Sequence, residues 1–113
     1  MPAPVLEKEI EKAVTDYAKQ TGWSGYKWVS PGYAGVPDRI YFIHGHCLCI
    51  EFKALGKRAT KLQQKHINIL HRHKIEAHVI DNVTEGKYVL DEAREKWAVS
   101  DSDTVPRGTK KVP

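Results

Sequence analysis

The sequence predicts an α/β fold: a restriction-endonuclease-like mixed sheet flanked by helices, in the order αβββαβα. Two observations carry this expectation. Apolar residues recur at helical spacing in three stretches, and two apolar runs joined by a very short turn indicate an antiparallel hairpin. A helical stretch after the hairpin leads to a further strand, so the sheet is expected to be mixed.

One helix and three strands are expected in the first half of the chain. Apolar residues at helical spacing predict a helix from Val5 to about Gln20, which Gly22 ends. A glycine- and proline-containing loop is expected over 31–37, and a tight turn at His44-Gly45. The three expected strands cover 26–30, 38–43 and 46–53.

The second half is expected to add a helix, a strand and a last helix. Gln63 follows Thr60 by three residues, the spacing of a capping box, so a helix is expected from there to about His73. The last strand and helix are expected over 77–81 and from Asn82 or Thr84 toward Trp97. Residues 1–100 are expected to form one domain, and the polar composition of 101–113 predicts a poorly packed tail.

Composition and charge set bounds on function. The chain has 113 residues, 41% of them hydrophobic and 28% charged, with a net charge of +4, which permits nucleic-acid binding without proving it. No apolar run approaches the length of a membrane span, and the N-terminus does not resemble a signal peptide, so we expect a cytoplasmic protein with no membrane partner. Cys47 and Cys49 are too close in sequence for an unstrained mutual disulfide and are expected to be free thiols.

The hairpin carries the most informative residues. If the turn has two residues, Ile43 pairs with His46, and counting back pairs Asp38 with Glu51. Directly opposed residues share a face with Cβ atoms about 4.5–5.5 Å apart. Two carboxylates that close repel one another unless a cation lies between them, and Lys53 lies two residues along the same face. This pattern predicts a divalent-metal site suited to phosphodiester hydrolysis.

The ligand types indicate Mg²⁺ or Mn²⁺ rather than zinc. A backbone carbonyl near Phe52 is a candidate further ligand. A third carboxylate is expected from the first helix, with Glu7 favoured and Glu11 in reserve. Lys53 is the candidate for stabilising charge in the transition state or orienting the water. Gln63 lies on the inward face of the second helix, where it either supports this site or only closes the capping box; both interpretations stay open.

At these positions the sequence resembles the VRR-NUC nucleases of the PD-(D/E)XK superfamily. The resemblance is carried by Gly35-Val36-Pro37-Asp38-Arg39, by Ile50-Glu51-Phe52-Lys53, and by Gln63 near the start of a helix. It implies that Asp38, Glu51 and Glu7 are metal ligands, Lys53 is catalytic and Gln63 supports them. It also implies metal-dependent DNA cleavage, often at branched structures. Short stand-alone members, often virus-encoded, resemble homodimers that cut four-way (Holliday) junctions, and we expect this class here.

Basic residues near the expected site are candidates for DNA contact. They are Lys27, Arg39, Lys57, Arg58 and Lys61, with Lys65 close by. Two other functions remain open. One is a DNA-binding or assembly module on the same fold with weak or no cleavage. The other is an interaction protein stabilised by zinc on the closely spaced residues His44, His46, Cys47 and Cys49, although strand alternation separates His46 from the two thiols.

Overall fold

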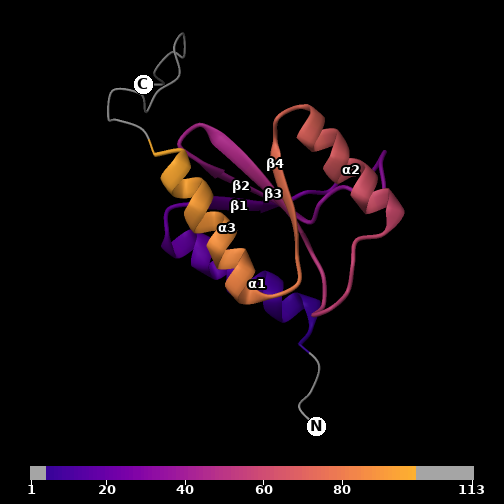
Figure 1. The fold of residues 1–113 in the computed structure, drawn as a ribbon, viewed down its shortest axis with the longest axis horizontal. Helices are drawn as coiled ribbons and strands as arrows, with labels where there is room; N and C mark the ends of the chain where they lie inside the picture. The colour runs from indigo at the N-terminus through magenta and orange to yellow at the C-terminus, as the bar shows by residue number, and fades with distance from the viewer. Residues whose placement is uncertain (1–4, 99–113) are drawn as a thin grey trace.

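Three helices flank a four-stranded mixed sheet in the computed structural model, which describes residues 5–98 (Figure 1). The helices are α1 (Glu7–Gln20), α2 (Lys61–Arg72) and α3 (Val83–Lys96). The strands are β1 (Ser24–Lys27), β2 (Arg39–Ile43), β3 (His46–Phe52) and β4 (Glu76–Ile80). This order, αβββαβα, confirms the predicted fold class and is consistent with a restriction-endonuclease-like fold. The expected boundary near residue 100 and the tail over 101–113 lie outside the described residues.

The hairpin has the register that its short turn predicts. The sheet order is β1-β2-β3-β4, with β1–β2 and β2–β3 antiparallel and β3–β4 parallel. Ile43 pairs with His46 across His44 and Gly45, which both have positive φ, as a two-residue turn of type I′ requires. At the other end of the ladder Arg39 pairs with Ile50. Asp38 and Glu51 are therefore the next two residues beyond the last pair.

The first strand differs from its predicted position. It spans Ser24–Lys27, whereas 26–30 was predicted. Trp28 still donates its amide to the Asp38 carbonyl at 2.9 Å, but the chain then leaves the sheet for a turn in which the Tyr33 amide donates to the Ser30 carbonyl at 3.2 Å. Val29 is accordingly 78% exposed and begins the loop.

The helices cover the two faces of the sheet and bury two separate clusters. α1 and α3 lie together on one face, and α2 lies on the other (Figure 1). Leu48, Ile50 and Phe52 of β3 face α1 and α3, whereas Cys49 faces Ile67 of α2. β3 is thus buried on both sides, which accounts for its continuous apolar run. Glu51 follows this alternation and points to the α2 side.

Helix ends place two of the residues that matter below. Thr60 and Gln63 form the predicted capping box at the start of α2, and Asn82, not Thr84, caps α3. α1 begins after Leu6, which offers no side-chain cap, so Glu7 lies on an uncapped first turn. At the other end of α1, Gly22 has a φ of +99° and the Trp23 amide donates to the Ala18 carbonyl at 2.9 Å, a Schellman ending.

None of the helices within 5–98 has the length and apolarity needed to cross a bilayer.

Candidate metal centre

Three carboxylates from three different elements meet at one end of the sheet. Glu7 comes from the first turn of α1, Asp38 directly precedes β2, and Glu51 lies near the end of β3. One oxygen from each lies within 4.8 Å of the others. This is the only such group of acidic, histidine or cysteine side chains among residues 5–98. The fold thus brings together the three carboxylates that the sequence singled out, although they are far apart along the chain.

Asp38 is held by backbone contacts on both sides. Its Oδ2 accepts a hydrogen bond from the Phe52 amide at 2.7 Å, and its carbonyl accepts one from Trp28. Pro37, just before it, is fully buried. Burial raises the pKa of Asp38 above its usual value, and the bond from the Phe52 amide opposes this rise. These backbone contacts therefore fix both the main chain and the carboxylate of Asp38.

Glu51 is the most buried of the three acids. It is 2% exposed, and its Oε2 accepts a hydrogen bond from Gln63 Nε2 at 3.0 Å. Lys53 Nζ lies 3.7 Å from the same oxygen. The other oxygen, Oε1, is buried with no hydrogen-bond partner. The pKa of Glu51 is raised to about 7, chiefly because the carboxyl group is buried and secondly because Asp38 repels its negative charge.

The donor set fits a hard divalent cation. Carboxylate oxygens are the ligands that Mg²⁺ and Mn²⁺ prefer, and Glu51 Oε1 is a buried acceptor that lacks a partner within the protein. A cation near the three carboxylates would satisfy that oxygen and offset the repulsion from Asp38 and Glu7 that adds to the effect of burial on the pKa of Glu51. Phe52, whose carbonyl the sequence suggested as a further ligand, contacts this cluster through its amide, which donates to Asp38 Oδ2.

Gln63 plays both roles that the sequence left open. Its Oε1 accepts from the Thr60 amide at 2.9 Å, which closes the capping box. Its Nε2 donates to Glu51 across the gap between α2 and the sheet. One amide has one acceptor and two donors, so a single side chain serves both purposes.

Glu11 is engaged elsewhere. Arg39 Nε donates to Glu11 Oε2 at 2.7 Å, and both side chains are about 20% exposed. This pair leaves Glu7 rather than Glu11 in the carboxylate cluster. It also means that Arg39, a candidate DNA contact, is ion-paired in this structure. This contact could not be predicted from the sequence, because nothing local links two residues 28 positions apart.

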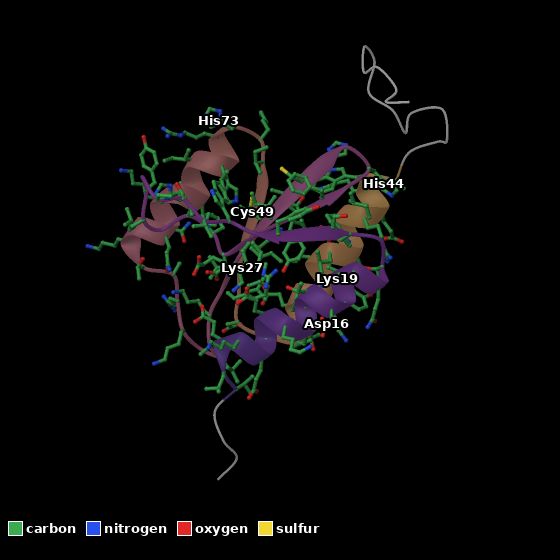
Figure 2. All side chains as sticks on the ribbon, turned by 180° about the vertical axis from the view of Figure 1, so that it is seen from behind. Asp16, Lys19, Lys27, His44, Cys49 and His73 are labelled. Carbon is green, nitrogen blue, oxygen red and sulfur yellow. The ribbon has the colours of Figure 1, made fainter. Side chains whose placement is uncertain are left out.

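The remaining basic candidates line two cavities on different elements. Lys27 and Arg39 line one of about 440 Å³ beside α1, with Lys19 (Figure 2). Lys57, Arg58 and Lys61 line another of about 480 Å³ at the start of α2. Glu11 lines the first and lies one turn after Glu7, while Thr60 lines the second and bonds Gln63. Basic surface therefore adjoins the cluster from both sides.

The geometry does not assemble a zinc site from the cysteines and nearby histidines. His44 lies at the hairpin turn while Cys49 lies within the sheet (Figure 2). His46 stacks on Trp97, with ring centroids 4.7 Å apart. Burial raises the pKa of the Cys49 thiol to about 12, which disfavours the thiolate that zinc needs. Both cysteines are free thiols, as expected.

Comparison with known proteins gives one partial relative. No family model matches the chain. A stretch of 60 residues is 38% identical to a protein of Acyrthosiphon pisum secondary endosymbiont phage 1 that is named "Putative nuclease p44". The match covers 52% of this chain and 64% of that relative, which is just under two thirds of its length. At the level of sequence, the chain is therefore similar to part of a phage protein named as a nuclease.

Proposed function

We propose that this chain is a metal-dependent, structure-selective DNA endonuclease that hydrolyses phosphodiester bonds in four-way or other branched DNA. The observation that carries the proposal is the buried, unpartnered Oε1 of Glu51 within a cluster of three carboxylates, with Lys53 beside it. Partial identity to a phage protein named as a nuclease supports the same activity. Within this proposal the chain is a divergent relative of the VRR-NUC nucleases, and nuclease is its general class.

The residues divide into three roles. Glu7, Asp38 and Glu51 would hold Mg²⁺ or Mn²⁺, with the Phe52 carbonyl as a candidate fourth ligand. Such an ion, when bound, polarises a phosphate and lowers the pKa of a water. Gln63 fixes the orientation of Glu51, and the Phe52 amide fixes that of Asp38.

Lys53 is the residue proposed to act on the substrate. Its ammonium lies on the Glu51 side of the cluster, and the Lys53 side chain as a whole is 16% exposed, so it is largely shielded from water. A charge in that environment interacts strongly with negative charge that develops on a phosphate. Lys53 therefore stabilises the transition state.

The DNA contacts proposed from the sequence are Lys27, Arg39, Lys57, Arg58 and Lys61. They adjoin the cluster from the α1 side and the α2 side, so a duplex crossing the site would contact both. A four-way junction needs two symmetric incisions, which a two-fold homodimer supplies. The proposal therefore includes a homodimer as the active species.

The test is cleavage of a labelled four-way junction and of linear duplex, each with Mn²⁺ or with EDTA. We expect metal-dependent products from the junction, weaker cleavage of the duplex, and none with Asp38→Ala. Arg94→Ala, on α3 away from the cluster, serves as the control and is expected to cleave normally. No metal-dependent product from any substrate would overturn the enzyme, and junction binding without cutting would favour a DNA-binding module.

The homodimer has its own test. Sedimentation of the protein with and without a junction is expected to give the mass of two subunits, at least when DNA is bound. A monomer under both conditions would remove symmetric junction cutting while leaving the nuclease proposal intact.

A further inference from the structure

An aromatic cavity on the α2 side of the sheet has no part in the proposed chemistry. It measures about 280 Å³, close to the lower end of ligand-binding cavities, which begin at about 300 Å³. Its wall is almost wholly apolar and is formed by Trp28, Tyr33, Val36, His66, Ile69 and Leu70, with Ser30 beside them. Two of these are aromatic rings and a third is an imidazole. Tyr33 and His66 meet edge to face, with centroids 6.4 Å apart.

The cavity is built on a fixed frame. Gly35 has a φ of +87°, and a Cβ at that position would lie 2.8 Å from Leu62 of α2, so the loop packs closely on the helix. Trp28 is tied by its amide to the carbonyl of Asp38, one of the three clustered acids. Tyr33, in contrast, is 70% exposed. The cavity therefore combines anchored walls with a free aromatic ring.

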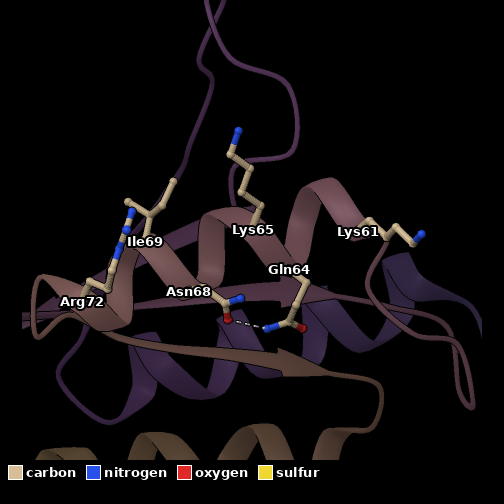
Figure 3. Close-up of a pocket in the computed structure, with 6 residues that line it drawn as sticks. All are labelled: Lys61, Gln64, Lys65, Asn68, Ile69 and Arg72. Atoms are coloured by element: carbon tan, nitrogen blue, oxygen red, sulfur yellow. Dashed lines mark hydrogen bonds between the residues drawn. The ribbon is translucent and has the colours of Figure 1, made fainter.

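The surface next to the cavity is strongly basic. Residues 52–75 contain seven Lys and Arg and no Asp or Glu, whereas the whole chain has a net charge of only +4. Lys65 and Arg72 project from α2 on either side of Ile69 (Figure 3). Ile69 lines both this basic surface and the aromatic cavity. An occupant with an apolar planar group and flanking negative charges would match both features.

We propose that this cavity receives an unpaired base of single-stranded DNA, while Lys65 and Arg72 contact the phosphates on either side of it. Stacking of bases on aromatic rings, combined with a cationic track, is how proteins hold single strands without reading their sequence. In a duplex the bases are stacked inside and cannot enter. The inference rests on the proposed nuclease function and deepens it, because it supplies a reason for branched DNA with unpaired nucleotides to be preferred.

The experiment measures binding of a labelled oligo-dT strand and of a matched duplex to the whole chain in EDTA, so that no cleavage is needed. Tyr33→Ala is expected to weaken single-strand binding by about fivefold or more, from the stacking lost per base, and to leave duplex binding unchanged. Tyr33→Phe keeps the ring and is expected to restore binding. Tyr88→Ala removes an equally exposed tyrosine, 62% exposed on α3, and is expected to change nothing.

Several outcomes would overturn the inference. One is that Tyr33→Ala weakens binding of the single strand and of the duplex equally, and another is that it weakens neither. A third is that Tyr33→Ala changes the mass of the oligomer in solution, which would mean that a second copy of the chain covers the cavity. Thermal unfolding of each variant separates misfolding from loss of contact, and His66→Ala provides a second test of the same wall. Mn²⁺-dependent cleavage is measured in parallel: cleavage without ring-dependent binding defeats this inference alone, and ring-dependent binding without cleavage defeats the nuclease alone.

Discussion

Gln63 joins the start of α2 to Glu51 through a single amide. Its oxygen accepts from the Thr60 backbone, and its nitrogen donates to the Glu51 carboxylate at 3.0 Å. The position of a buried acid is therefore set by the same side chain that begins the helix. Disturbing that side chain is expected to affect both stability and the proposed metal centre.

Gln63→Ala and Thr60→Ala separate these two effects. Thr60→Ala loses only its part of the cap and is expected to cost about 1 kcal/mol of unfolding free energy. Gln63→Ala loses the cap and the bond to a buried carboxylate, so about 2–3 kcal/mol is expected. Urea unfolding measures both. Only Gln63→Ala is expected to slow Mn²⁺-dependent cleavage; equal slowing in the two variants would contradict a role at Glu51.

Because the pKa of Glu51 is raised, the metal-free protein is expected to lose stability as the pH rises. Its folded pKa of about 7 lies above its ordinary value of 4.5, so the folded state binds the proton more tightly than the unfolded state. Its contribution to stability is full below about pH 4.5 and is lost as pH rises through about 7. The loss is at most about 3 kcal/mol, at 1.36 kcal/mol per pKa unit. Asp38 adds to the loss in the same direction.

Glu51→Gln tests this dependence. The variant is expected to be at least as stable as the parent in EDTA at pH 8, with a weaker fall in stability between pH 5 and 8. Glu9→Gln, an exposed acid on α1, is the control and is expected to follow the parent. Thermal unfolding across this pH range is the measurement, and a Glu51→Gln variant that is markedly less stable than the parent at pH 8 would contradict the prediction.

Glu7 and Glu11 form a matched pair one turn apart. Glu7 belongs to the carboxylate cluster, whereas Glu11 is paired with Arg39. Glu7→Gln is expected to reduce the rise in melting temperature caused by Mn²⁺, and Glu11→Gln to leave it unchanged. The reverse result would assign the third ligand to Glu11.

Lys53→Ala distinguishes metal binding from catalysis. Cleavage is expected to fall by about 100-fold or more, the usual cost of losing one group that stabilises transition-state charge. Stabilisation by Mn²⁺ is expected to remain, but at higher pH, because Lys53 lowers the pKa of Glu51. Lys87→Ala, which removes an exposed lysine on α3 away from the cluster, is the control. Unchanged cleavage by Lys53→Ala would exclude a catalytic role.

At Gly86, α3 packs tightly against Val14 of α1. A Cβ there would lie 2.5 Å from Val14 Cγ2 and 3.3 Å from Ile80, so Gly86→Ala is expected to cost about 1–3 kcal/mol of unfolding free energy. Val14→Ala makes room for the added methyl group. The double variant is expected to lose less unfolding free energy than the sum of the losses of the two single variants. A loss equal to that sum would show that the contact between Gly86 and Val14 does not limit packing.

The hairpin shows how much of this molecule local patterns predict. A two-residue turn fixes which residues face one another, so counting from Ile43 and His46 was enough to bring Asp38 opposite Glu51. Thr60 and Gln63 likewise specify a helix start by themselves. These features depend on short stretches of chain, and the structure confirms them.

Other features depend on contacts that no local pattern encodes. The early end of β1 at Lys27 depends on where its partner strand β2 begins, at Arg39, which is evident only once the register of β1 and β2 is known. The pairing of Arg39 with Glu11 joins a strand to a helix, and helical spacing alone did not separate Glu7 from Glu11. The bond from Gln63 to Glu51 requires the packing of α2 on the sheet.

The start of α1 lacks a capping side chain, and Glu7 lies on that first turn. Glu51 belongs to a paired strand and Asp38 directly precedes one, whereas Glu7 is carried by a segment prone to fraying. Loading the centre would then tighten the beginning of this helix, and amide protons at positions 9 and 10 would exchange with deuterium more slowly. Hydrogen exchange thus reports whether the centre holds a metal ion, without the need for a substrate or for cleavage.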